Sequence, residues 1–185
     1  MVISSDNGPH ATEIKGYSPN FFGTHGGLRG HKRSLYEGGI RVPTLIRWKG
    51  RIRANGITRA PFNLHQLSAT FADAAGIETN AGSTRSMLPV WISGDQEAPR
   101  GWGMYSELCK SAPGGRLINC VSVVYNTSDW KNGSLWKLRV SPNGKATTLY
   151  DLKADPKEVR PVNDPQVRDA LLAWRKSIRL DPNSM

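Results

Sequence analysis

The chain has 185 residues, of which 38% are hydrophobic, and its 25 basic against 15 acidic residues give a formal net charge of +10. This length suits one ordinary domain, or the end of one domain plus a small second one. No apolar run approaches the roughly 18 residues that a membrane span needs. Residues 1–3 lead directly into polar residues, which is not the pattern of a signal peptide. We therefore expect no membrane partner and no signal peptide in this chain.

The positive charge raises the question of a nucleic-acid partner. The basic residues are scattered over the first third of the chain and the last predicted helix, and no recognised nucleic-acid motif accompanies them. We therefore expect no nucleic acid. The charge favours an anionic substrate through long-range attraction. A solvated basic surface explains the same charge equally well.

The first predicted element is the end of a buried strand at residues 1–4, followed by Asp6, Asn7 and Gly8. In open α/β sheets, ligands bind outside the carboxyl ends of the strands. A carboxylate beside a carboxamide offers oxygen ligands to a hard cation. The same three residues also form a good turn without any ligand. From the residues alone, both interpretations stand.

Residues 11–27 are rich in Gly, Ser, Pro and Asn, which indicates a loop over this site that shapes substrate choice. Lys32 follows among glycines, where its ammonium group can face an anion attracted by the cation. At residues 36–39 we expect a tight turn, with glycines chosen for their backbone angles and Glu37 anchoring the turn through backbone bonds. Residues 40–48 then predict a buried strand of a large sheet.

A helix is predicted near residues 64–75, because apolar residues recur on one helical face and Gly76 follows as a stop signal. We expect that apolar face, which carries Leu64, Leu67 and Phe71, to pack in the core. Residues 78–100 are rich in turn-forming residues and are expected to be a passage to a smaller C-terminal part.

The C-terminal part predicts a small antiparallel sheet with a helix. Strands are expected at residues 104–108, 117–125, 135–140 and 147–152, with a hairpin turn at residues 141–144. For the final helix, Asp164 is the expected cap, and an apolar stripe should pack on the sheet; the stripe consists of Val167, Ala170, Leu171, Trp174 and Ile178. Cys109 and Cys120 would pair in an exported protein and remain thiols in a cytosolic one, so the sequence leaves the disulfide open.

Several segments resemble one known family. SDNGPH at residues 5–10, followed by LRGHKRSLYEGGIRVP at residues 28–43, resembles the second signature region of the sulfatases, the formylglycine-dependent sulfate-ester hydrolases of the alkaline phosphatase superfamily. RWKGRI, HQLSATFADAAGI and KLRVSPNGKATTLYDLKADPKE resemble later segments of that family in the same order. We call residues 28–43 the signature block.

The resemblance implies an α/β fold: the C-terminal part of a sulfatase-like α/β sandwich, plus a small antiparallel sheet with a C-terminal helix. Its expected division is the end of the large domain at residues 1–77, a linker at residues 78–100 and a small α+β subdomain at residues 101–185.

The resemblance also implies a set of site residues. Asp6 and Asn7 would bind the metal, expected to be Ca²⁺, and would supply only part of its six to eight oxygen ligands. Lys32 stands where the family carries a sulfate-contacting lysine, so a catalytic and substrate-binding role is expected. His10 would contact substrate near the sulfate, although an exposed loop histidine is an equal alternative. His25 and His31 are weaker candidates.

One family motif is absent from the chain. The formylglycine nucleophile arises from Cys or Ser in a C/S-x-P/A-x-R motif, and neither Cys109 nor Cys120 fits it. Formylglycine is therefore expected in a missing N-terminal part, and this chain, as a fragment, is expected to be inactive alone. For the full-length parent a periplasmic or secreted location is expected.

The expected function is hydrolysis of a sulfate ester of an aryl or sugar substrate, with a divalent metal. The alternative is a non-catalytic sulfatase remnant that binds a sulfated glycan or a partner chain, possibly a complementary N-terminal fragment. A third possibility is a phosphoester or phosphonate hydrolase of the same superfamily, against which the GHKRSLYEGG segment argues.

Overall fold

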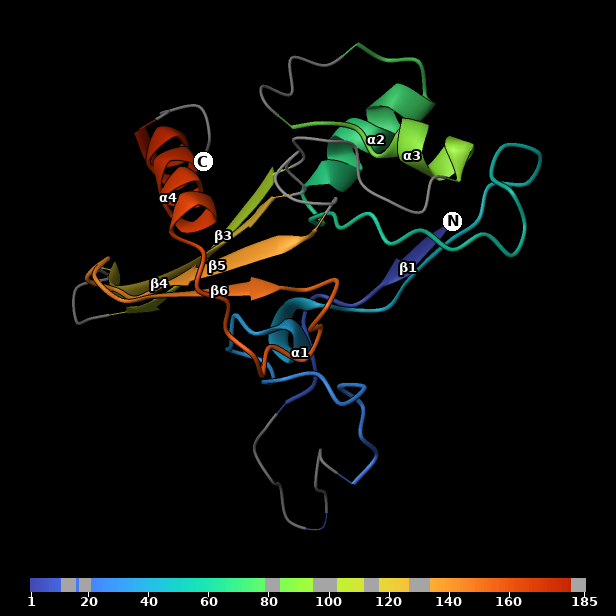
Figure 1. The fold of residues 1–185 in the computed structure, drawn as a ribbon. Coiled ribbons are helices and arrows are strands. Elements are labelled where there is room, and N and C mark those ends of the chain that lie inside the picture. Colours follow the sequence, from blue (N-terminus) through green and yellow to red (C-terminus); the bar gives the residue numbers. More distant parts are fainter. Residues whose placement is uncertain are drawn as a thin grey trace.

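The fold contains two separate antiparallel sheets and four helices within the part of the chain that the structure describes (Figure 1). This computed structural model describes residues 1–10, 16, 21–78, 84–94, 103–111, 117–126 and 134–180. None of its described helices combines the length and the apolar character needed to cross a bilayer.

The first sheet is a two-stranded ribbon. Strand β1 (Val2–Ser4) pairs with β2 (Thr44–Ile46) so that Val2 lies opposite Ile46 and Ile3 opposite Leu45. Val2 and Ile46 contact the core, whereas Ile3 and Leu45 are 52% and 65% exposed. The prediction of buried strands was therefore wrong for one face of this ribbon, because no described residue covers that face.

The second sheet has four strands in the order β3-β4-β5-β6, all antiparallel. They are β3 (Gly103–Ser111), β4 (Leu117–Asn126), β5 (Trp136–Val140) and β6 (Thr147–Asp151). The predicted hairpin turn is present, because the Ser141 N–H donates to the Ala146 carbonyl and Gly144 takes a φ of 73°. These elements confirm the small antiparallel sheet expected from the sequence.

The sequence left the state of the cysteines open, and the structure answers it for Cys109. Cys109 is disulfide-bonded, and the chain's only other cysteine is Cys120, on the neighbouring strand β4.

Helix α4 (Pro165–Leu180) covers one face of this sheet (Figure 1). Val167 and Leu171 are 2% and 0% exposed and pack with the apolar residues of the sheet, which are Trp136, Leu138, Val140 and Leu149. The Val167 N–H donates to Asp164 Oδ1 at 3.2 Å, so the predicted cap is confirmed. Burial of this stripe, at about 25 cal/mol per Å² of apolar area, is what holds the helix to the sheet.

The short helix α1 (Glu37–Ile40) lies on the opposite side of the sheet from α4 (Figure 1). It forms where the sequence predicted a tight turn, and the Arg41 N–H closes it by donating to the Glu37 carbonyl at 2.8 Å. The four-stranded sheet is therefore covered by the apolar stripe of α4 on one face and by the signature block on the other (Figure 1).

Helix α2 (Gln66–Ala74) and helix α3 (Leu88–Ser93) pack against each other. The predicted buried face of α2 was correct for Leu67, which packs against the core, but wrong for Leu64 and Phe71, which are 39% and 51% exposed. The most buried side chain of the helix is that of Thr70, which is 1% exposed. The Thr70 hydroxyl accepts the Met87 N–H at 2.9 Å, so α2 docks through polar bonds rather than through its phenylalanine. Helix α3 itself lies in the segment expected to be a passage.

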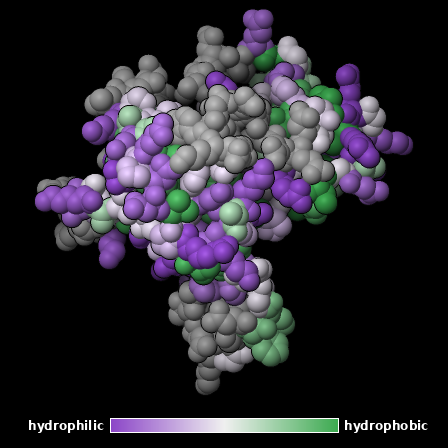
Figure 2. Space-filling view, in the orientation of Figure 1, coloured by the Kyte–Doolittle hydropathy of each residue, from purple (hydrophilic) through white to green (hydrophobic). Residues whose placement is uncertain are grey.

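Several exposed apolar residues lie on the ribbon and on helices α2 and α3. Figure 2 shows hydrophobic residues among hydrophilic ones where α2, α3 and β1 lie in Figure 1. Ile3, Leu45, Phe71 and Ile92 are exposed hydrophobic residues of these elements and of the paired β2.

Candidate active site

The two predicted parts of the site, the SDNGPH segment and the signature block, meet through their backbones. The Gly8 N–H donates to the Gly39 carbonyl at 2.9 Å, and the Lys32 N–H donates to the Pro9 carbonyl at 2.8 Å. The chain thus brings Lys32 beside the segment that carries Asp6, although the two lie about two dozen residues apart in the sequence.

Glycines allow this close approach. A Cβ atom on Gly8 would lie 1.9 Å from the Gly38 carbonyl oxygen, and one on Gly38 would lie 2.2 Å from the Gly30 oxygen. A Cβ on Gly39 would lie 2.2 Å from the Ser34 oxygen. Neither Gly38 nor Gly39 has a positive φ. The sequence interpretation therefore gave the wrong reason for these glycines: they are needed for space, not for backbone angles.

Lys32 lies at the corner of a tight turn. The Ser34 N–H donates to the His31 carbonyl at 3.0 Å, and Arg33 takes a φ of 71°. A non-glycine residue in this left-handed region costs about 1–2 kcal/mol, so the surrounding bonds must hold the turn in place. The Lys32 side chain is exposed, and no described residue pairs with its ammonium group.

Asp6 and Asn7 present oxygen atoms of the type that Ca²⁺ prefers. Asp6 is exposed, and among the described residues its carboxylate receives a long bond of 3.5 Å from the Ser5 hydroxyl. The Asn7 side-chain N–H donates to the Gly8 carbonyl at 2.9 Å, which leaves the Asn7 amide oxygen as the atom for a ligand. Among the described residues no group of three or more His, Cys, Asp or Glu side chains gathers around a metal position. The oxygen atoms of Asp6 and Asn7 are therefore of the right type for a hard cation, but they would supply only a minority of its six to eight ligands.

The predicted histidines lie close to the same segments. His10 is exposed and directly follows Pro9, whose carbonyl accepts the Lys32 N–H. The rings of His25 and His31 pack with their centroids 5.0 Å apart. Most of the loop expected over the site, residues 11–15 and 17–20, lies outside the described residues. Its described end carries Phe21 and Phe22, which are 81% and 66% exposed.

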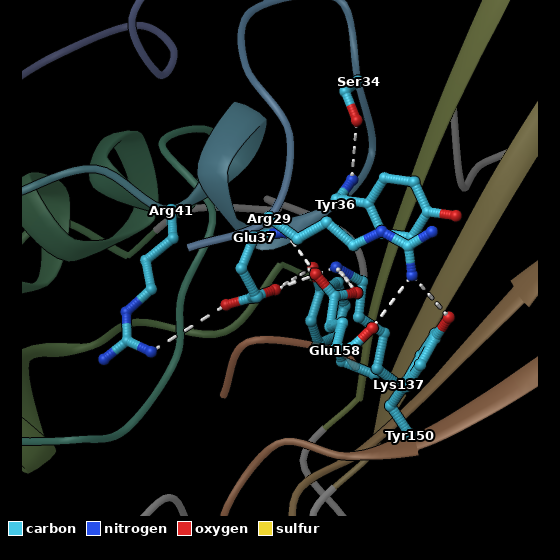
Figure 3. Close-up of polar contacts among 9 residues, drawn as sticks. Arg29, Ser34, Tyr36, Glu37, Arg41, Lys137, Tyr150 and Glu158 are labelled. Carbon is cyan, nitrogen blue, oxygen red and sulfur yellow. Dashed lines mark hydrogen bonds and ion pairs between the residues drawn. The ribbon is translucent and has the colours of Figure 1, made fainter. Parts of the chain in front are cut away.

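Beneath the signature block lies a buried charged cluster that sequence reasoning missed, formed by Glu37, Lys137 and Glu158 (Figure 3). The Lys137 ammonium lies 2.9 Å from Glu37 Oε1 and 2.8 Å from Glu158 Oε1. Lys137 and Glu158 are 0% exposed and Glu37 is 5% exposed. We call these three residues the charge cluster. It joins α1 to β5 and to the turn after β6.

Hydrogen bonds complete the charge cluster. The Tyr125 hydroxyl donates to Glu37 Oε1 at 2.9 Å, and the Glu37 N–H donates to Glu158 Oε2 at 2.6 Å. Burial raises the pKa of Glu158 above its ordinary value, against the opposing effect of the Lys137 charge. Burial and the neighbouring Glu37 raise the pKa of Tyr125 well above its usual value. The hydroxyl therefore remains a donor to Glu37 at neutral pH.

The sequence did contain a signal for this cluster. Glu37 and Glu158 both lie in segments that resemble the family, and Lys137 opens one of them. No local pattern, however, indicated that Lys137 is buried between these two carboxylates. Glu37 does anchor its turn, but through side-chain bonds to Lys137 and Tyr125 as well as through its own backbone.

Two solved structures match the fold of the chain. A phosphonate monoester hydrolase from Silicibacter pomeroyi matches with a TM-score of 0.55 and 23% identity, over 83% of this chain and 31% of that one. A 2-O GAG sulfatase matches with a TM-score of 0.52 and 18% identity, over 96% of this chain and 34% of that one. The described elements, a ribbon with helices and a small antiparallel sheet, are therefore part of the α/β architecture of these hydrolases.

The sequence comparisons are more specific. Residues 1–77 match the family model named Sulfatase. The steryl-sulfatase of Mus musculus is 25% identical over 204 residues, which cover 92% of this chain and 30% of that protein. The chain is therefore similar to members of the sulfatase family, and it spans somewhat less than a third of the length of this relative.

Proposed function

We propose that this chain supplies the metal-binding and sulfate-contacting part of a sulfuric ester hydrolase that acts on an aryl or sugar sulfate. In this proposal Asp6 and Asn7 bind Ca²⁺, while Lys32, together with His10, contacts the sulfate. The bond between the Lys32 N–H and the Pro9 carbonyl carries the proposal, because it joins the lysine turn to the Asp-Asn segment. The match of residues 1–77 to the family model named Sulfatase and the similarity to a steryl-sulfatase support it.

The chemistry of each residue follows from its charge. The Lys32 ammonium would neutralise negative charge that grows on the sulfuryl oxygens as the ester bond breaks. The oxygen atoms of Asp6 and Asn7 would orient the cation at the same place, and a bound Ca²⁺ would polarise the sulfate. The net charge of +10 would attract anionic substrates over a longer range.

The chain itself contains no C/S-x-P/A-x-R motif. We therefore propose that it does not turn over sulfate esters alone, and that a complementary segment with the formylglycine nucleophile completes the site. The exposed Ile3 and Leu45 of the ribbon support such a partner, because apolar side chains of this size are usually covered. The disulfide at Cys109 supports a periplasmic or secreted location, where such bonds persist.

Calorimetric titration of the full chain with sodium sulfate, with and without Ca²⁺, tests the anion site. Lys32→Met should weaken sulfate binding by about tenfold, since a charge-assisted hydrogen bond is lost. Lys49→Met is the matched control, because it removes the same charge from another exposed lysine. Equal losses in both variants would mean that only overall charge attracts sulfate, and Lys32 would lose its assigned role.

Asp6→Asn tests the metal site by the same method. It should abolish the strengthening of sulfate binding by Ca²⁺ while leaving the metal-free binding nearly unchanged. Turnover of an aryl sulfate by the isolated chain would refute the proposed incompleteness. Sulfate binding without turnover even after addition of a segment with the nucleophile motif would favour the alternative, a non-catalytic remnant that binds sulfated glycans. Tighter binding of phenylphosphonate than of sulfate would favour the phosphonate-hydrolase alternative.

A further inference from the structure

The charge cluster is not explained by stability alone. A buried ion pair loses its hydration, and replacing such a pair by apolar residues of similar size is often neutral or stabilising. Lys137, at 0% exposed, nevertheless has carboxylates from two distant parts of the chain as its partners, Glu37 and Glu158. A charged pair has a directional geometry that an apolar contact lacks. The charge cluster is therefore suited to holding the segments that carry Glu37 and Glu158 in one fixed position relative to β5.

Glu158 holds the signature block at two points. Its side-chain Oε2 accepts the Glu37 N–H at 2.6 Å, and its backbone carbonyl accepts Arg29 Nη1 at 2.9 Å (Figure 3). Lys32 lies between Arg29 and Glu37 in the sequence. Both ends of the segment that carries Lys32 are thus tied to one residue of the C-terminal subdomain.

Further contacts strengthen both ends. Arg29 also donates to the Tyr150 hydroxyl at 3.2 Å and lies 4.0 Å from the centroid of the Tyr36 ring. The Gly38 N–H donates to the Arg29 carbonyl at 2.7 Å, which closes the segment into a loop. Tyr150 belongs to the buried core next to the cluster, and the partly buried Tyr36 packs against that core.

Glu158 itself adopts an unusual backbone conformation. Its φ is 55°, in the left-handed region that non-glycine residues rarely enter. The turn around it is held by Asp155, whose carbonyl accepts the Glu158 N–H at 3.1 Å and whose Oδ2 accepts the Arg160 N–H at 2.7 Å. Strained backbone of this kind persists where the surrounding structure requires one geometry, and it is frequent near functional sites.

We propose that Lys137 and Glu158 are positioning residues for the Lys32 turn, so that the C-terminal subdomain sets the geometry of the anion site without contacting the anion. The proposal rests on the proposed function of Lys32 as the sulfate contact. It assigns the second half of the chain a role in binding rather than only in folding.

Two variants distinguish an effect on the position of the Lys32 turn from a general loss of stability. Each lowers the stability of the chain, but they lie on opposite faces of the same sheet. Lys137→Met removes the charge between the two carboxylates, and Leu171→Ala opens the apolar contact under α4. The full chain with each change is compared by amide hydrogen exchange and by titration with inorganic sulfate. Both are measured at a temperature where circular dichroism shows that both variants are folded.

Lys137→Met should increase exchange at the Lys32 and Gly38 amides by about tenfold or more, and should weaken sulfate binding by about tenfold, since small displacements of a positioned group lower its effect sharply. Leu171→Ala should leave both quantities within about twofold of the unchanged chain, because its face does not contact the signature block. Equal exchange at residues 29–40 in the two variants, or unchanged sulfate affinity in Lys137→Met, would overturn the proposal.

Two further outcomes are decided by the same experiment. If Lys137→Met does not fold, Tyr125→Phe takes its place, because it removes only the hydroxyl bond to Glu37 and should shift both readouts in the same direction by less. If the unchanged chain binds no sulfate while exchange at residues 29–40 responds selectively, the proposed function fails and the positioning of the turn stands. If exchange does not respond, the positioning role fails whatever the affinity.

Discussion

The two faces of strand β5 are held by different forces. Trp136, Leu138 and Val140 pack against α4 in an apolar layer, whereas Lys137 on the other face is bound to two carboxylates. An apolar layer tolerates small shifts and does not respond to pH. A buried ion cluster fixes geometry and depends on each of its members. One strand thus carries a face that mainly stabilises and a face that mainly orients.

Lys137→Met should have the largest effect on stability. Removing one member of a buried ion pair costs about 3–5 kcal/mol, because the remaining charges stay buried without a partner. Urea-induced unfolding measures the change. The control Lys145→Met, at an exposed lysine of the adjoining hairpin, should change the free energy of unfolding by less than about 0.5 kcal/mol.

A combined variant sharpens the comparison. Adding Glu37→Gln and Glu158→Gln to Lys137→Met removes the unpaired charges, so more than half of the lost free energy of unfolding should return. If the free energy of unfolding does not recover in the triple variant, the hydrogen bonds of the charge cluster, and not its charges, hold the Lys137 face of β5.

Leu171→Ala should have the next largest effect, about 2–5 kcal/mol, from lost burial and the cavity left under α4. The loss should be the same at every pH at which the chain is folded, since no charge is involved. Leu172, which is only partly buried, provides the control, and Leu172→Ala should cost less than half as much. A pH-dependent loss in Leu171→Ala would contradict the distinction between the two faces.

Asp164→Ala should lower the free energy of unfolding by about 1 kcal/mol, because the Val167 N–H loses the side chain that caps it. The first turn of α4, which covers the apolar face of the sheet, is then less stable. Asp169→Ala, at an exposed position of the same helix, should have little effect on the thermal midpoint. Equal shifts from the two changes would mean that only the negative charge near the helix start matters.

Glu158→Gln should remove the pH dependence that the Glu158 carboxyl gives to the free energy of unfolding. The pKa of Glu158 is raised in the folded chain, so folding takes up a proton there. The contribution of Glu158 is then fully present below its ordinary pKa of 4.5 and is lost as the pH rises through the higher folded value. Unfolding free energies of the two chains, measured from acid to neutral pH, should diverge in that interval. Parallel curves would contradict the raised pKa.

The sequence predicted those elements that depend on local pattern. The four strands of the second sheet and the capped helix α4 follow from alternation, turn residues and the Asp164 signal, all within a few residues. The approach of Lys32 to the Asp-Asn segment was expected only from the family resemblance, since no local pattern joins positions two dozen residues apart.

The errors concern contacts made at long range. The burial of Lys137 was not expected, because its partners, Glu37 and Glu158, are far away in the sequence. Phe71 was expected in the core, but the polar bonds of Thr70 to the Met87 backbone decide which face of α2 is buried. The burial of a residue depends on what covers it, and the pattern of its own element does not contain that information.

The bare backbone contact among Gly8, Gly38 and Gly39 affects how a mutational scan of this protein would be read. None of the three supplies a chemical group to a ligand, yet a single methyl group at any of them would collide with a carbonyl oxygen. A scan scored by loss of sulfate retention would rank these positions beside Lys32. Such a scan would then overcount the side chains that contact the anion, because it would include glycines that only allow two backbone segments to approach each other.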